Sequence, residues 1–110
     1  MGERKTEILR GTLDMLILKA LSLNPMHGLG VARRLDQITG GVFQVKPGSL
    51  FPALHRLEQE GWIEGEWSGS ESNRKAKYYR LTRAGRERLG EEQESWSHVV
   101  LAITRVLETT

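Results

Sequence analysis

The most constraining feature of the sequence is a long amphipathic pattern near its C-terminal end. From residue 83 to residue 108, after the expected capping residue Thr82, apolar residues recur at three- and four-residue steps, which is helical spacing. The stripe consists of Leu89, Trp96, Val99, Val100, Ile103, Val106 and Leu107. A continuous helix of this length extends roughly 39 Å at 1.5 Å per residue, more than a small domain can cover. The pattern therefore predicts a helix that packs against a partner.

Two helices are expected near the N-terminus. Helical spacing of apolar residues predicts one over residues 9–23 and a shorter one over about residues 29–38. The first is apolar on nearly all sides, so we expect it to pack on its own core and on something more. A partner subunit is one candidate, and we assign Leu13 and Ile17 to that contact.

A third helix and a β-hairpin are expected next. Pro47-Gly48 predicts a turn, Ser49 offers a hydroxyl that can cap the helix, and Gly61 marks the end of the helix. Residues 62–67 and 75–81 flank a polar, Gly-rich stretch, and the second segment is aromatic and alternating. This arrangement predicts a β-hairpin.

The order helix, helix, turn, helix, hairpin is that of a winged helix-turn-helix. The expected fold class is therefore mainly α with a β-hairpin wing (α+β), followed by a long C-terminal dimerisation helix. We expect residues 1–82 to form the winged helix-turn-helix domain and residues 83–110 to form the dimerisation helix, within one compact unit.

Composition and spacing argue against an enzyme. The chain has no cysteine, and no two of its histidines (His27, His55 and His98) fall within one helical turn. Gly28 and Gly30 form only a fragment of a dinucleotide-binding fingerprint and lie between helices, which is the wrong context. We therefore expect no catalytic site, no metal and no cofactor.

The same features bear on localisation. The N-terminal residues lack the apolar run of a secretory signal, and no segment approaches the length needed to span a bilayer. The absence of cysteine is compatible with a reducing compartment. We expect a cytoplasmic protein with no membrane partner.

Positive charge is concentrated around the predicted hairpin. The formal net charge of the chain is only +2, but residues 74–88 carry a local net charge of +6. This run is either a solvated face or a strip that binds phosphates. Arg74, Lys75 and Lys77 lie at or just beyond the expected hairpin tip, where a wing can reach the phosphates of double-stranded DNA. Neutral residues of the same loop are supporting candidates.

The third helix has the two faces that a DNA-reading helix needs. Its buried face is expected to hold Leu50, Ala53, Leu54 and Leu57. The outward face, with its flanks, gives the candidate DNA-binding residues Gly48, Ser49, Pro52, His55, Arg56 and Gln59. Their polar side chains can present donors and acceptors to base edges. An ordinary amphipathic helix facing water would show the same pattern.

The sequence resembles the PadR-like family of transcriptional regulators. The resemblance rests on the blocks GTLDMLILKALS, HGLGVARRL, GSLFPALHRLEQEGWI and RKAKYYRLTRAGR, which stand in the family's order over nearly the whole chain. It implies a homodimeric winged-helix regulator of the shorter subfamily, usually a repressor, whose third helix enters the major groove. Two departures are visible, because Leu29 and Phe51 stand where the family commonly has tyrosine.

The resemblance also implies that the last helix contacts the partner subunit. The expected dimer-interface residues are Leu13, Ile17, Trp96, Val99, Val100, Ile103 and Leu107. Trp96 is interpreted first as an interface-core residue. The alternative is contact with a small aromatic effector, because some similar regulators hold flat aromatic compounds at the dimer centre. A winged helix used only for protein interaction is the alternative function, and the basic strip argues against it.

Overall fold

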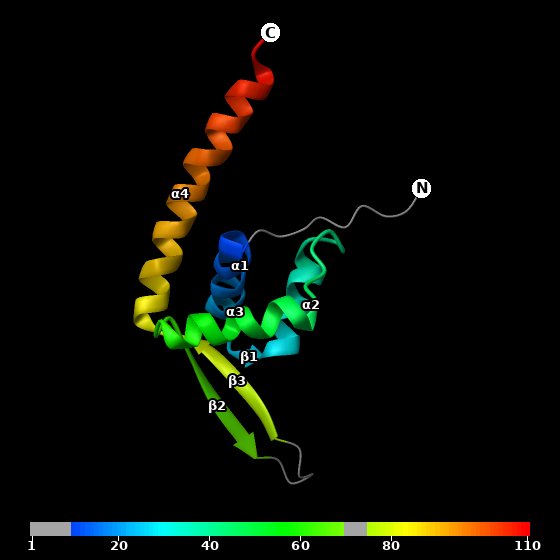
Figure 1. The fold of residues 1–110 in the computed structure, drawn as a ribbon, viewed down its shortest axis with the longest axis vertical. Coiled ribbons are helices and arrows are strands. Elements are labelled where there is room, and N and C mark those ends of the chain that lie inside the picture. The colour runs from blue at the N-terminus through cyan, green and yellow to red at the C-terminus, as the bar shows by residue number, and fades with distance from the viewer. Residues whose placement is uncertain (1–9, 70–74) are drawn as a thin grey trace.

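The computed structural model describes residues 10–69 and 75–110. Its body consists of three helices and a small sheet, with a fourth helix leaving at one end and a hairpin at the other (Figure 1). The elements are α1 (Arg10–Leu23), β1 (Met26–His27), α2 (Gly28–Ile38), α3 (Pro47–Gln59), β2 (Ile63–Gly69), β3 (Lys75–Leu81) and α4 (Arg83–Glu108). The predicted α+β winged helix-turn-helix with a long C-terminal helix is confirmed.

Helix α1 lies at the centre of the core. Its apolar residues are buried on several sides because α1 contacts α2, α3, α4 and β3. Leu13 is 4% exposed and Ile17 is fully buried. The apolar surface of α1 is thus largely covered by the chain itself. We assigned Leu13 and Ile17 to a partner contact, but both have almost no exposed surface in the protomer.

Helix α3 begins two residues earlier than its expected cap. The helix starts at Pro47 with Lys46 as its N-cap, and the backbone N–H of Ser49 donates to the carbonyl of Lys46 at 3.0 Å. The predictions that Ser49 caps this helix and that Pro47-Gly48 forms a turn before it are therefore wrong. Proline at the first helical position has its φ angle already set for a helix and lacks only an N–H that would be unpaired there. Gly61 ends the helix as predicted, with φ of 78°.

The sheet has one strand more than the predicted hairpin. The strands stand in the order β1-β3-β2, all antiparallel. Strand β1 is only two residues long and pairs Met26 with Tyr79 and His27 with Tyr78. A segment this short shows no periodicity, which is why the sequence pattern missed it. Pairing with β3 fixes the start of α2 against the base of the hairpin.

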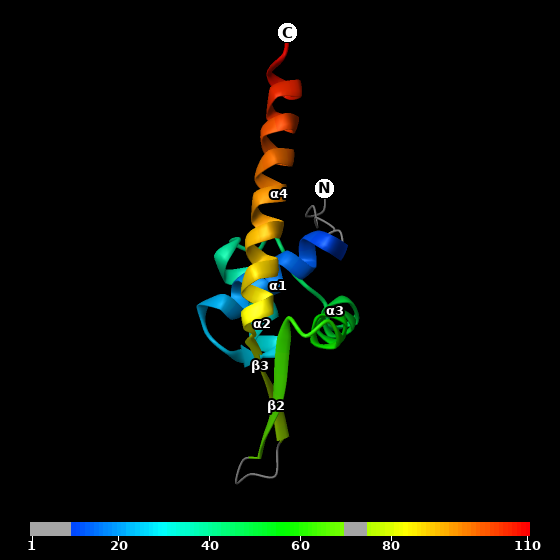
Figure 2. The ribbon, with the colours of Figure 1, turned by 90° about the vertical axis from the view of Figure 1, so that its left-hand side faces the viewer.

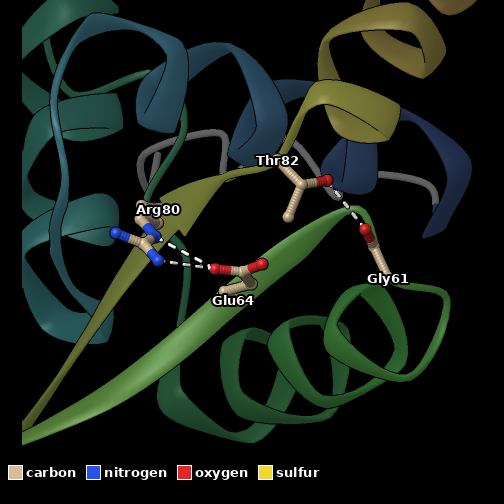
Figure 3. Close-up of polar contacts among 4 residues, drawn as sticks. All are labelled: Gly61, Glu64, Arg80 and Thr82. Carbon is tan, nitrogen blue, oxygen red and sulfur yellow. Dashed lines mark hydrogen bonds and ion pairs between the residues drawn. The ribbon is translucent and has the colours of Figure 1, made fainter.

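A compact junction sets the direction of α4. The Thr82 hydroxyl donates to the carbonyl of Gly61 at 2.7 Å (Figure 3). The same hydroxyl accepts from the backbone N–H of Gly85 at 3.0 Å. The backbone N–H of Thr82 donates to the carbonyl of Trp62 at 3.1 Å. Thr82 is therefore the N-cap predicted from the sequence, and it also ties α4 to the end of α3.

Gly85 allows α4 to approach the start of β2 backbone to backbone. Gly85 is buried, and a Cβ atom added there would lie 2.0 Å from the carbonyl oxygen of Trp62. Only glycine fits such an approach without displacing the backbone.

Beyond the junction, α4 leaves the body (Figure 2). From Gly90 to Glu108 every residue is exposed except the half-buried Glu92. Apolar side chains among them, such as Ile103 at 51% and Leu107 at 78% exposure, face solvent in the protomer. Within the described ranges, the helices lack the combined length and apolarity that crossing a bilayer requires.

Replacing Gly85 by alanine should destabilise the fold by about 3 kcal/mol or more, because the new methyl group would displace the backbone of α4 from the carbonyl of Trp62. Gly90 on the same helix is the matched control, since a Cβ there meets nothing within 4 Å. Gly90→Ala should stabilise by roughly 0.5–1 kcal/mol through helix propensity. Urea unfolding at a fixed protein concentration measures both changes. Equal stability of the two variants would contradict the close approach.

Candidate nucleic-acid interface

Helix α3 separates a buried face from an exposed one. Leu50, Ala53, Leu54 and Leu57 are fully buried. Gly48, Ser49, Pro52, His55 and Gln59 are exposed on the other side. The buried leucines pack into the core, so the exposed residues are held on a rigid support.

His55 and Gln59 lie one helical turn apart on this exposed face. Residues at i and i+4 project from the same side of a helix, so the two side chains stand next to each other. Both groups can donate and accept hydrogen bonds. The outer face of α3 is thus uncharged but capable of hydrogen bonding, as the sequence predicted.

Arg56 lies on the flank of α3 that faces α1. Its Nη2 donates to Oδ1 of Asp14 at 2.8 Å, and both side chains are about three-quarters buried. This ion pair fastens the middle of α3 to α1. Arg56 therefore stands apart from the exposed row formed by Pro52, His55 and Gln59, and sequence spacing gave no sign of its partner, 42 positions away.

Lys77 links the hairpin to α3. Its Nζ donates to Oε1 of Glu58 at 2.9 Å, and it lies 5.7 Å from the centre of the Trp67 ring and 5.4 Å from that of Tyr79. The hydrogen bond to Glu58 raises the pKa of Lys77 above its ordinary value, which keeps the ammonium group charged. Sequence reasoning placed Lys77 on the phosphate surface and missed Glu58 and Trp67 as its neighbours.

Other cations of the basic run also have partners. Arg80 makes two hydrogen bonds to the Glu64 carboxylate, at 2.8 and 3.0 Å (Figure 3). Arg88 pairs with Glu92 on α4 and stacks on the Trp62 ring at 4.7 Å. Lys77, Arg80 and Arg88 of the charge run are thus used in ion pairs, whereas Arg83 and Arg86 are exposed at the start of α4.

Arg74 and Lys75 are the remaining predicted wing residues. Arg74 lies outside the described residues, as do the neutral loop residues Ser70, Ser72 and Asn73. The backbone of Lys75 begins β3 and pairs with Gly69 of β2. Lys75 therefore stands at the outer end of the paired strands.

The two positions that depart from the family's tyrosines are both partly exposed. Phe51 is 45% exposed on α3, and its ring packs so closely on Gly28 that a Cβ there would meet it at 3.0 Å. Leu29, near the start of α2, is 53% exposed. Phe51 thus lies where α2 and α3 meet.

A shallow groove of about 270 Å³ runs between α1 and α4. Trp96 lines it together with Gly11, Thr12, Met15, Glu92, Ser95 and Val99. Among residues 10–69 and 75–110, no group of three acidic, histidine or cysteine side chains is placed to hold a metal ion.

A helix-turn-helix body, a β-hairpin packed beside its third helix and a long final helix define a winged helix-turn-helix protein. The model of the transcriptional regulator PadR-like family matches residues 17–91, and the chain belongs to this family. It is a transcriptional regulator by family.

Similar proteins cover most of the chain. A transcriptional regulator of Mycobacterium tuberculosis is 33% identical over 89 residues, which span 81% of this chain and 79% of that relative. A PadR family regulator from Eggerthella lenta has a TM-score of 0.81 at 32% identity, covering 92% of this chain and 86% of its own. A PadR-like regulator from Bacillus cereus has a TM-score of 0.78 at 30% identity, covering 96% and 100%.

The Glu58–Lys77 pair should contribute about 1 kcal/mol of coupling energy in a double-mutant cycle of Glu58→Gln and Lys77→Met, because both groups are partly shielded from water. The pKa of Lys77 is raised above 10.5 in the folded state. The coupling energy is therefore fully present below pH 10.5 and is lost as the pH rises through the pKa of Lys77 in the folded protein. Unfolding in urea at pH 8 and above pH 11 measures it. A coupling that persists at the higher pH would contradict the assignment.

Proposed function

We propose that this PadR-family regulator is a homodimeric, sequence-specific repressor that binds an inverted-repeat operator in double-stranded DNA in the cytoplasm. The observation that carries the proposal is the opposition on α3 between fully buried leucines and an exposed, uncharged, polar row. A helix held rigidly from behind and polar in front suits reading base edges in a major groove.

His55 and Gln59 are the proposed base readers. A glutamine amide can pair with adenine through two hydrogen bonds, and a histidine ring can donate or accept one. Gly48, Ser49 and Pro52 occupy the first turns of the same exposed face, where close approach to the DNA backbone suits small residues. Arg56 is the proposed residue with the weakest support, because Asp14 holds its guanidinium.

The wing is proposed to neutralise phosphates through Arg74 and Lys75. Lys77 belongs to the same strand, but its ammonium group already pairs with Glu58. A cation with a protein partner releases fewer counterions when DNA binds, so its share of the electrostatic affinity is smaller.

The dimer is proposed to form through α4. Trp96, Val99, Val100 and Ile103 are 41–51% exposed, and together with Leu107 they form one stripe along the helix. A contiguous apolar stripe is the surface that a second copy of the chain would cover. Trp96 fits the core of this interface, and a small aromatic effector is the alternative occupant of the groove that it lines.

Replacing Ile103 by aspartate should weaken the dimer, because it places a charge in the apolar seam. Leu101→Asp is the matched control, since Leu101 is 60% exposed on the opposite side of α4. Light scattering across a dilution series measures the mass of each variant. The wild type and Leu101→Asp should stay dimeric where Ile103→Asp is monomeric. A monomeric wild type would overturn the proposed assembly.

Replacing His55 or Gln59 by alanine should cost about 1–3 kcal/mol against the preferred operator and much less against random duplex. The loss is selective because base-edge contacts form only with the right sequence. Fluorescence anisotropy with DNA from upstream of the protein's own gene measures both affinities. Gln37→Ala, an equally exposed glutamine on α2, is the control and should change neither.

The spacing of the operator provides a separate check of the same helix. Two recognition helices related by a two-fold axis require half-sites roughly 10 base pairs apart or a multiple of this. Inserting about half a helical turn between them should abolish cooperative binding of the dimer. Undiminished binding after the insertion, or equal losses on specific and random DNA for both α3 variants, would contradict base reading by α3.

A further inference from the structure

The hairpin carries a large aromatic side chain that the proposed recognition surface does not use. Trp67 on β2 is 63% exposed, more than Trp96 or Phe51. An indole ring buries a large area when it meets a partner, and its N–H is a hydrogen-bond donor. Its position in the fold indicates what that partner is.

Trp67 lies on the side of the hairpin that faces α3. The strand register places it directly opposite Lys77, and directly opposed residues project from the same face of a sheet. Lys77 reaches Glu58 on α3, and a Cβ on the neighbouring Gly65 would collide with both of these side chains. Trp67 therefore stands farther out on this same face, towards Lys75 and the hairpin tip. Figure 1 shows the hairpin running away from the body below α3.

The Trp67 ring has a cation beside it. The Lys77 ammonium group lies 5.7 Å from the centre of the Trp67 ring and 5.4 Å from that of Tyr79, and it also pairs with Glu58. Cation–π contacts of this kind are worth about 0.5–1 kcal/mol at exposed sites. Because Glu58 pairs with Lys77, the exposed indole is an uncharged, accessible group on this face of the hairpin.

We infer that Trp67 contacts DNA directly, with its indole ring against the sugar–phosphate backbone that passes between α3 and the hairpin. The inference rests on the proposed function and adds a residue to the same surface. A strand of DNA whose groove holds α3 must pass beside the face that carries Trp67. Deoxyribose offers an apolar surface to the ring, and a phosphate oxygen can accept from the indole N–H. Glu58 and Lys77 are then positioning residues that set the angle between the wing and α3.

The contact is uncharged, which separates it from the phosphate contacts of the basic wing. Loss of a cation makes the dependence of affinity on salt shallower, by about 0.9 in log–log slope for each phosphate released. Loss of the indole removes affinity without removing a charge. Sugar–phosphate contacts also carry little sequence information, so specific and random duplexes should be affected alike.

The test is binding of Trp67→Ala, Trp67→Phe and Tyr78→Ala to a random duplex and to DNA from upstream of the gene, over a salt series. Tyr78 is the control for loss of an aromatic ring, because it is exposed on the opposite face of the hairpin, where it contacts His27 of β1. Trp67→Ala should bind both duplexes about tenfold more weakly with an unchanged salt slope. Trp67→Phe should retain most of the affinity, and Tyr78→Ala should bind as the wild type does. Thermal unfolding of each variant verifies that it is folded at the assay temperature.

Three results would overturn the inference. First, Trp67→Ala could bind DNA as tightly as the wild type does. Second, it could lose affinity with a shallower salt slope, and this result would assign the lost contact to the charge of Lys77. Third, Trp67→Ala and Tyr78→Ala could lose affinity equally, which would place the effect in the integrity of the hairpin. If the wild type binds neither duplex, the proposed function itself fails, and this result is distinct from the other three.

Discussion

The close approach of Gly85 to the carbonyl of Trp62 is the constraint on which the arrangement of the molecule depends. It allows the backbone of α4 to pack on the backbone at the start of β2, while the Thr82 hydroxyl ties both to the end of α3. The last turn of α3, the base of the hairpin and the first turn of α4 therefore meet within a few residues. The orientation of the exposed face of α3 is thereby fixed relative to α4.

Ion pairs support the same geometry from either side of α3. Arg56 joins the helix to α1 through Asp14, and Lys77 joins it to the hairpin through Glu58. Both cations belong to segments that the sequence associates with nucleic acid, yet their charges are used inside the protein. The exposed row on α3 is uncharged, so in the proposed interface the electrostatic contribution comes from residues outside this row.

The sequence was sufficient to predict those elements whose pattern is local. The helices follow from apolar spacing, the bounds of α4 agree with the predicted range, and the faces of α3 follow from periodicity. Features that depend on distant residues were not accessible, such as the short strand β1, the Asp14 partner of Arg56 and the Glu58 partner of Lys77. The error at Ser49 has a different cause, since Pro47-Gly48 was expected to form a turn but instead begins α3.

Much of α4 lies outside the body, so its helical conformation depends on contacts from outside the protomer. Isolated helical turns are marginal in water, because ordering each residue costs about 1–2 kcal/mol of backbone entropy and tertiary contacts normally offset this cost. From Gly90 onward, α4 has few such contacts within the protomer. Its helicity is therefore linked by mass action to whatever covers it, and in the proposed homodimer the fraction of fully helical chains rises with protein concentration. Under that proposal, the amount of the protein in the cell sets how much of α4 is folded.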